Sequence, residues 1–291
     1  MAGSLESQVD NLWFLPIEPF DEAHHVLGLS IGLSETLMNC NLQGIEVNGR
    51  AIDYFPAVEF NVASRDGDLI PLDHDLLRNL QGHSYWDVAL SPGKVWSEAD
   101  DGGWSRAALP FQLTNNFESD THHGIATFLY RDAEILPIVF QIVAETKAFL
   151  CPENRQAWGW LKPPAARLKS DDLNERVDAY LGEIQDRLPI KSLGDWQSCD
   201  TQLYIKDIEQ GLGSDSTIVT RLVVDDVIYT MPCQTSMGNY PYPRAMKFGI
   251  WSATKTALCT VAYLRLAQVM GEDPRDTEVA ALLSEAKVNA N

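Results

Sequence analysis

Two side chains near the C-terminal end of the chain have the spacing of an activated nucleophile. Ser252 and Lys255 lie where a Pro- and Gly-rich stretch, residues 238–244, gives way to good helix formers from Ala257 to Met270. Residues i and i+3 of a helix share one face, about one turn apart. The spacing therefore predicts a hydroxyl beside an amine at the start of a helix, which suits a serine nucleophile that is activated by a lysine.

The surroundings of this pair favour the same chemistry. A lysine acts as a base only where burial or a neighbouring cation lowers its pKa, and Phe248, Trp251 and Leu258 predict an apolar environment of that kind. A helix N-terminus adds partial positive charge, and the N–H of Ser252 can stabilise a developing oxyanion. The alternative interpretation is a serine at a helix start that is followed by a solvated lysine.

The Ser-x-x-Lys pattern also occurs at Ser91-Pro92-Gly93-Lys94. Pro-Gly favours a turn, so the serine and the lysine of this copy do not share a helix face. We expect a loop there and no catalytic role. No G-x-S-x-G elbow surrounds Ser252, and no phosphate loop or dinucleotide fingerprint is present.

Residues 240–256, YPYPRAMKFGIWSATKT, are followed by an apolar helix. This region resembles the nucleophile region of the serine β-lactamase and penicillin-binding-protein superfamily. Within that superfamily it is most similar to the class C enzymes and to the β-lactamase-related esterases. The resemblance covers the end of the chain. It implies that Ser252 is acylated by a small-molecule ester or amide, that Lys255 is the general base, and that no cofactor or metal takes part.

Tyr240 and Tyr242 precede the serine helix. The family has a tyrosine near its nucleophile, and we expect Tyr240 and Tyr242 to take its place and bind substrate. Turn residues that pack beside their prolines are the alternative. The family also uses a Tyr-x-Asn or Ser-x-Asn element and a Lys/His-x-Gly strand, and neither follows Ser252 in the printed sequence.

We therefore expect either a fragment of a longer hydrolase, with weak or no turnover of activated esters by itself, or a non-catalytic β-rich binding or interaction module with a vestigial site. Without the late strand, the apolar C-terminal helix should stay exposed, so we also expect self-association through it.

The charge of the chain limits its partners. The 291 residues include 41 Asp and Glu against 22 Lys and Arg, a formal net charge of −19, which argues against nucleic acid and anionic membranes. No run of about 18 apolar residues predicts a transmembrane helix, and the first residues do not resemble a signal peptide. The five cysteines have no metal-ligand spacing, so reduced thiols and a cytoplasmic location are favoured.

The hydrophobic patterns predict an α+β chain in three parts. Residues 1–150 read as a β-rich domain, a sandwich or small barrel, and residues 151–200 read as a helical connector. Residues 201–291 read as a β-hairpin followed by the serine helix, and the resemblance implies that they are a partial β-lactamase-like serine hydrolase domain. The break at Pro163-Pro164 predicts a protease-sensitive connector.

Several local elements can be predicted individually. Asn48-Gly49 and Asp225-Asp226 are expected to be hairpin turns between short strands. Residues 75–80 are expected to form a short helical turn. Residues 171–188 predict an amphipathic helix, because their apolar residues recur at helical spacing: Leu173, Val177, Tyr180, Leu181 and Ile184.

Two groups of histidines and acids, in residues 21–25 and 118–123, contain imidazole and carboxylate groups that could bind a divalent metal. Adjacent histidines on a strand point to opposite faces, so polar loop histidines are the favoured interpretation. Trp96, Trp104 and Arg106 predict core aromatics with an arginine at the rim, and a ligand groove is the alternative.

Overall fold

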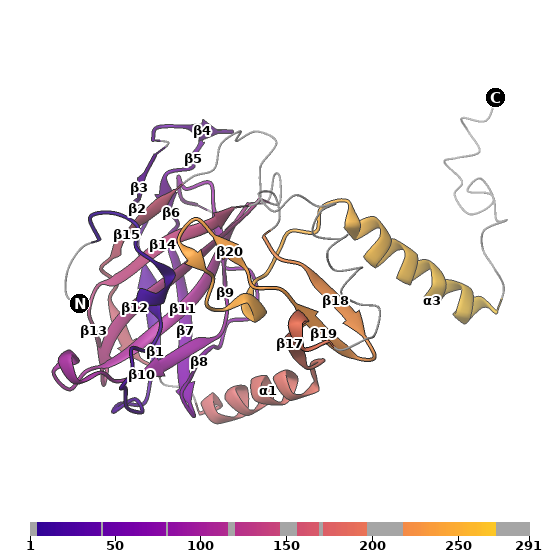
Figure 1. The fold of residues 1–291 in the computed structure, drawn as a ribbon. Coiled ribbons are helices and arrows are strands. Elements are labelled where there is room, and N and C mark those ends of the chain that lie inside the picture. The colour runs from indigo at the N-terminus through magenta and orange to yellow at the C-terminus, as the bar shows by residue number, and fades with distance from the viewer. Residues whose placement is uncertain are drawn as a thin grey trace. The chain divides into compact units, whose positions relative to one another are not determined.

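The computed structural model describes residues 5–41, 43–79, 81–115, 120–145, 156–168, 171–196 and 218–271. The chain divides into two compact units, Met1–Phe248 and Gly249–Asn291, and each is described by itself. The first unit is α+β and mostly β (Figure 1).

The strands are β1 (Gly28–Leu33), β2 (Thr36–Leu37), β3 (Asn39–Cys40), β4 (Glu46–Val47), β5 (Arg50–Ala51), β6 (Tyr54–Phe55), β7 (Val58–Arg65), β8 (Asp68–Pro71), β9 (Asp87–Leu90), β10 (Gly93–Trp96), β11 (Ser105–Thr114), β12 (Thr121–Arg131), β13 (Glu134–Ile135), β14 (Ile138–Glu145), β15 (Ala157–Leu161), β16 (Ala165–Arg167), β17 (Ile190–Ser192), β18 (Arg221–Val224), β19 (Val227–Thr230), β20 (Gln234–Thr235) and β21 (Gly238–Asn239). The helices are η1 (Asn11–Phe14), η2 (Ala99–Asp101), α1 (Leu173–Asp186), η3 (Leu193–Asp195), η5 (Pro243–Ala245), η6 (Lys255–Thr260) and α3 (Val261–Met270).

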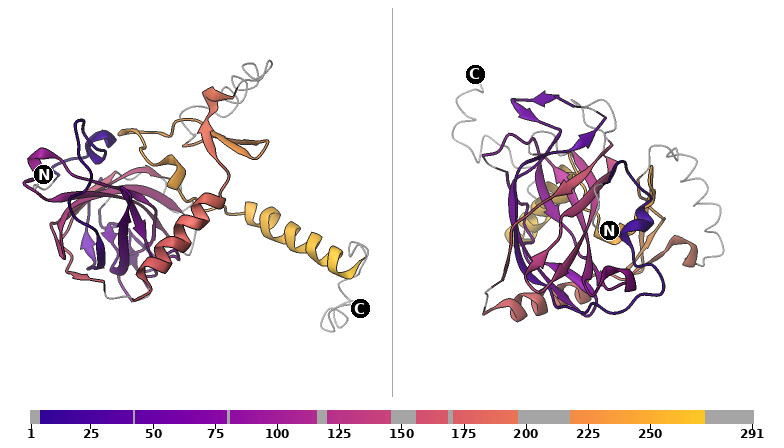
Figure 2. Two further views of the ribbon diagram at one scale, coloured as in Figure 1. Left: turned by 90° about the horizontal axis from the view of Figure 1, so that it is seen from below. Right: turned by 90° about the vertical axis from the view of Figure 1, so that its left-hand side faces the viewer.

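One antiparallel sheet organises the first unit. Its strand order is β16-β1-β7-β8-β10-β11-β12-β14-β15-β3, with β9 paired to β11 and β13 paired to β12. The sheet curls around its core, so that β16 lies against β13 (Figure 2). The predicted β-rich character is therefore confirmed, and the main element is one continuous curled sheet.

The centre of the sheet is formed by the two longest strands. β11 and β12 pair from Ser105↔Tyr130 to Thr114↔Thr121. Nearly every residue of both strands is buried, because one face lines the core and the other is covered by later segments.

Turn chemistry fixes the hairpins where the sequence predicts them. Asn48 and Gly49 adopt φ values of 52° and 73° between β4 and β5. Asp225 and Asp226 adopt 48° and 58° between β18 and β19. Left-handed conformations at both central residues match the strand twist, which is why Asn, Asp and Gly occupy them.

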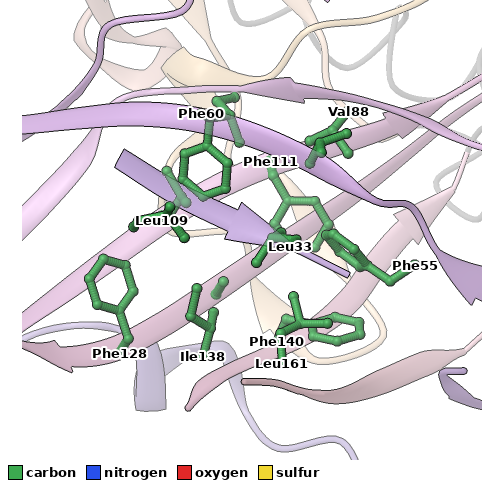
Figure 3. Close-up of a cluster of buried hydrophobic side chains, with 14 of the residues drawn as sticks. Leu33, Phe55, Phe60, Val88, Leu109, Phe111, Phe128, Ile138, Phe140 and Leu161 are labelled. Atoms are coloured by element: carbon green, nitrogen blue, oxygen red, sulfur yellow. The ribbon is translucent and has the colours of Figure 1, made fainter. Parts of the chain in front are cut away.

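The concave side of the sheet encloses an apolar core (Figure 3). Phe55 lies at its centre, with its ring centroid 5.5 Å from that of Phe111 and 4.9 Å from that of Phe140. The cavity left among these side chains is about 20 Å³, room for about one water molecule. The interior is a packed core and not a ligand chamber.

Helix α1 covers part of the outer face of the sheet. Val177 and Tyr180 are its buried residues, and they pack against Ala63, Ile70 and Leu72 of β7, β8 and the residue after β8. The amphipathic helix predicted for residues 171–188 is confirmed. Its single apolar stripe is what holds it on the sheet.

A second cluster covers the outer face of β12 and β14. Phe14 of η1 packs there with Ile125, Val143, Cys233 and Tyr240. The first and last segments of the unit are also joined directly, since the Asn11 N–H donates to the Met237 carbonyl at 2.8 Å.

The compact units differ from the predicted division near residues 150 and 200. β15 and β16, inside the predicted connector, pair with β14 and β1. The Pro164 carbonyl accepts the Gly32 N–H at 3.2 Å, so Pro163-Pro164 is bound into the sheet and is not a free linker. Proline restricts the chain locally, but it can still accept a hydrogen bond at a sheet edge.

The helical turn predicted at residues 75–80 is wrong over the described residues 75–79. Leu77 is extended and exchanges backbone hydrogen bonds of 2.8 and 3.0 Å with Val88 of β9. Tertiary strand pairing overrides the local helical preference there.

In the second unit, Ala253 and Thr254 begin a helix that continues through the π-helical turn η6 into α3. No residue of η6 or α3 is buried; Leu258, Val261, Leu264 and Val269 are each about three-fifths or more exposed. Self-association through this helix stays a prediction. Among the described residues, no helix has the length and apolar character that crossing a membrane requires.

Candidate functional site

Ser252 and Lys255 meet at the start of the second unit's helix. Lys255 Nζ donates to Ser252 Oγ at 2.9 Å. The backbone produces this contact locally, since the Lys255 N–H bonds to the Ser252 carbonyl at 3.1 Å and the two side chains rise on one face. The predicted i, i+3 contact is confirmed.

The residue before the serine has an uncommon backbone conformation. Trp251 has φ of +42°, in the left-handed region that bulky residues rarely enter. Its carbonyl accepts the Thr254 N–H at 3.1 Å, which closes the turn into the helix. Backbone outliers of this kind gather at functional sites, because they fix how a side chain is presented. No residue pattern in the sequence predicts this conformation.

The Ser252 N–H makes no hydrogen bond to any described residue. It precedes the first helical residue, Ala253, where backbone donors have no intrahelical acceptor. Such a donor can hold an anionic oxygen, as an oxyanion hole requires.

The apolar burial predicted around the pair is not observed. Ser252 and Lys255 are exposed, and Leu258 is 62 % exposed. Phe248 belongs to the first unit, where its ring centroid lies 4.5 Å from that of His123. The contact between hydroxyl and amine is therefore present without the dry environment that a lysine base needs.

The predicted substrate-binding tyrosines lie in the first unit. Tyr240 is buried, and its hydroxyl donates to the Gly124 carbonyl at 2.9 Å. Tyr242 is half-buried, and its hydroxyl is buried without a hydrogen-bond partner among the described residues. Burial raises the pKa of both phenols, so both are protonated near neutral pH. Their role in binding a substrate stays a prediction.

The other copy of the pattern does not bring its serine and lysine together. Ser91 is buried and donates to the Ala245 carbonyl at 2.7 Å. Lys94, on β10, points to Asp68, with Nζ 2.6 Å from the carboxylate. The structure therefore distinguishes two chain segments that share the same four-residue pattern.

The interpretation as polar loop histidines is wrong for His122 and His123, because both are buried on strand β12. They face opposite sides of the sheet, as expected of neighbours on a strand. The His122 ring lies 4.4 Å from Trp86 in the core, and the His123 ring contacts Phe248 and Tyr240 on the outer face. Glu118, of the same sequence group, is outside the described residues. Within the described ranges, no three His, Cys, Asp or Glu side chains come together as a metal site.

Arg106 is buried in an ion-pair cluster and not in a groove. Its guanidinium contacts Asp101 at 2.5 and 3.1 Å and Glu98 at 3.1 Å, and it lies 5.9 Å from the centroid of Trp96. Trp96 is a core aromatic as predicted, but Trp104 is only partly buried, and Arg106 is buried and does not lie at the rim.

The sequence analysis missed a set of basic residues that line one pocket: Arg187, Arg244 and Lys247. A signal was available, because Arg244 and Lys247 are close together in a chain with few basic residues. Their meeting with Arg187, more than fifty residues earlier, is visible only in the fold.

No protein-family model, curated protein or solved structure matches this chain.

Proposed function

We propose that the chain carries the nucleophile of a β-lactamase-related serine hydrolase, which acts on an ester or amide through an acyl-enzyme on Ser252. The observation that carries this proposal is the 2.9 Å contact between Lys255 Nζ and Ser252 Oγ. It is supported by the left-handed Trp251 and by the N–H of Ser252 at the helix start, which has no hydrogen-bond acceptor in the described part of the chain.

In the proposed reaction, the neutral amine of Lys255 takes the hydroxyl proton as Ser252 Oγ attacks the carbonyl carbon of the substrate. The Ser252 N–H holds the resulting oxyanion. The alcohol or amine of the substrate leaves with a proton, and water then hydrolyses the acyl-serine bond. As the general base, Lys255 Nζ would accept the hydroxyl proton along the same 2.9 Å contact.

A covalent probe tests the first half of this reaction without requiring turnover. A fluorophosphonate forms one bond from phosphorus to the serine oxygen and releases fluoride, so it needs only a nucleophile and a base. We expect intact-mass analysis to show one added label, and peptide mapping to place it on Ser252. Ser252→Ala should remove it.

The base is tested by Lys255→Met, which keeps a side chain of similar length but removes the amine. Loss of a general base slows the step by about a hundredfold or more, so labelling should slow to that extent. Lys94→Met is the matched control, because it alters the other Ser-x-x-Lys lysine, which pairs with Asp68. Label on another residue, or an unchanged rate in Lys255→Met, contradicts the proposal.

A second candidate is a non-catalytic β-rich binding module with a vestigial site. The exposure of both Ser252 and Lys255 favours it, because an unburied pair lacks the desolvation that activates a lysine. The labelling experiment separates the two candidates. If the chain is a non-catalytic module, Ser252 should react with the fluorophosphonate no faster than any other exposed serine.

A further inference from the structure

The first unit contains a pocket whose charge is opposite to that of the whole chain. It has a volume of about 230 Å³ and lies among the end of β8 and the residues after it, the turn between β9 and β10, helix α1 and its end, and η5 with the residues after it. Arg187, Arg244 and Lys247 line it, and Asp73 is its one acid. The chain as a whole has a net charge of −19. Such a local inversion of charge favours an anionic ligand.

The acid of the pocket is already neutralised from outside it. The Asp73 carboxylate accepts the Asn61 N–H at 2.5 Å and lies 3.7 Å from the guanidinium of Arg176. Arg176 does not line the pocket. Asp73 therefore does little to balance the three cations.

Two of the three cations have no carboxylate partner among the described residues. Lys247 Nζ donates to the Leu90 carbonyl at 2.9 Å, and Arg244 donates to the Ile190 carbonyl at 2.7 Å; neither has a carboxylate within 4 Å in the described part of the chain. Arg187 pairs with Glu183 at 2.5 Å, where both side chains are about half exposed. An ammonium has three donors and a guanidinium five, so each cation keeps donors for a ligand.

Lys247 is the most informative of these groups. Burial lowers its pKa, and Arg187 lowers it further, while Glu183 opposes the shift. Lys247 is nevertheless an exposed residue. Its ammonium can therefore meet an anion that enters the pocket, and attraction to that anion would favour the charged form of the lysine.

A neutral donor lies at the same wall. Tyr180 lines the pocket, is 7 % exposed, and its buried hydroxyl has no hydrogen-bond partner among the described residues. Burial raises its pKa to about 12, so the hydroxyl keeps its proton. Buried hydroxyls without acceptors are uncommon, and an acceptor oxygen on a ligand is the group that this one lacks.

We propose that this pocket binds a small oxyanion, the carboxylate or phosphate group of a small molecule, through Lys247, Arg244 and Arg187, with the Tyr180 hydroxyl as a neutral donor. Carboxylate and phosphate groups each present two or more oxygens that can accept paired hydrogen bonds from one arginine guanidinium. The proposal does not depend on Ser252, because every residue that it uses belongs to the first unit.

Titration calorimetry of the full chain with inorganic phosphate, citrate and acetate, at constant ionic strength held with chloride, tests this site. We expect saturable binding of at least one of them, and the best binder tells phosphate from carboxylate. Lys247→Met keeps a similar stem and removes the charge. It should weaken binding by about tenfold or more, since a hydrogen bond to a charged group is lost. Lys162→Met, which removes an exposed lysine outside the pocket, should bind like the parent chain.

Tyr180→Phe separates ligand binding from folding. It removes a hydroxyl that has no described partner and keeps the ring, so the unliganded protein should be at least as stable as the parent chain. Its affinity for the anion should nevertheless fall. The proposal is overturned if none of the three anions binds more tightly than chloride, or if Lys247→Met and Tyr180→Phe both bind with unchanged affinity.

Discussion

The buried His123 should make the stability of the first unit sensitive to mild acid. This residue of β12 is fully buried, and neither ring nitrogen has a hydrogen-bond partner among the described residues. Its ring packs against Phe248 and Tyr240. Burial lowers its pKa from 6.5 to about 3, because the imidazolium would lose its hydration without gaining a partner.

The direction in which pH changes the free energy of unfolding follows from proton uptake. Above the unfolded pKa of 6.5, neither the folded nor the unfolded chain protonates His123. As the pH falls below that value, the unfolded chain takes up a proton and the folded chain does not, so the free energy of unfolding decreases until the pH reaches the folded pKa. A pH of about 5 is roughly 1.5 units below the unfolded pKa of 6.5. The free energy of unfolding is therefore lower there by about 2 kcal/mol.

The assay is urea denaturation of the parent chain and of His123→Leu at about pH 7.5 and about pH 5. Leucine fills a similar volume and does not titrate. We expect the parent chain to lose about 2 kcal/mol more than the variant between these pH values. The control, His83→Leu, replaces a half-exposed histidine, so an effect that both variants share reports the loss of an imidazole and not the burial of His123.

Equal pH dependence in His123→Leu and the parent chain would refute this reasoning. It would mean that the folded protein accommodates the imidazolium, through a partner or through water. Nuclear magnetic resonance gives an independent check. One of the six histidines should show no ring titration between about pH 7.5 and pH 4.5.

Two further substitutions test the packing of the sheet by urea denaturation at neutral pH. Arg106→Met should cost about 3–5 kcal/mol, because it leaves the Asp101 side chain, 1 % exposed, without its buried cation; a loss below about 1 kcal/mol would show that this cation is dispensable. Gly93→Ala should cost about 1–3 kcal/mol or more, because its methyl carbon would lie 1.8 Å from the Ala108 carbonyl oxygen, a backbone atom of the neighbouring strand. An unchanged urea midpoint for Gly93→Ala would mean that β10 and β11 can separate without loss.

Local sequence was sufficient where neighbouring residues decide the structure. Asn48-Gly49 and Asp225-Asp226 turn because of their own backbone preferences. Residues 171–188 form a helix because their apolar positions recur with its period. The contact between Ser252 and Lys255 follows from helical spacing alone.

Only the tertiary structure decided the features that join distant segments. The predicted boundary near residue 150 failed to anticipate that β15 and β16 complete the sheet, because strand pairing depends on partners far along the chain. The sequence could place His122 and His123 on opposite faces, but not show that later residues bury His123. The exposure of Lys255 also differs from what its apolar neighbours in sequence predict.

The basic pocket shows the same limit most clearly. Tyr180 and Arg187 come from α1 and its end, whereas Arg244 and Lys247 come from a segment more than fifty residues later. Hydrophobic periodicity tells which face of α1 is buried, but not which cations that face will meet. Charge pattern along the chain cannot supply this information, because the pocket is created by packing, which brings together groups that the sequence keeps apart.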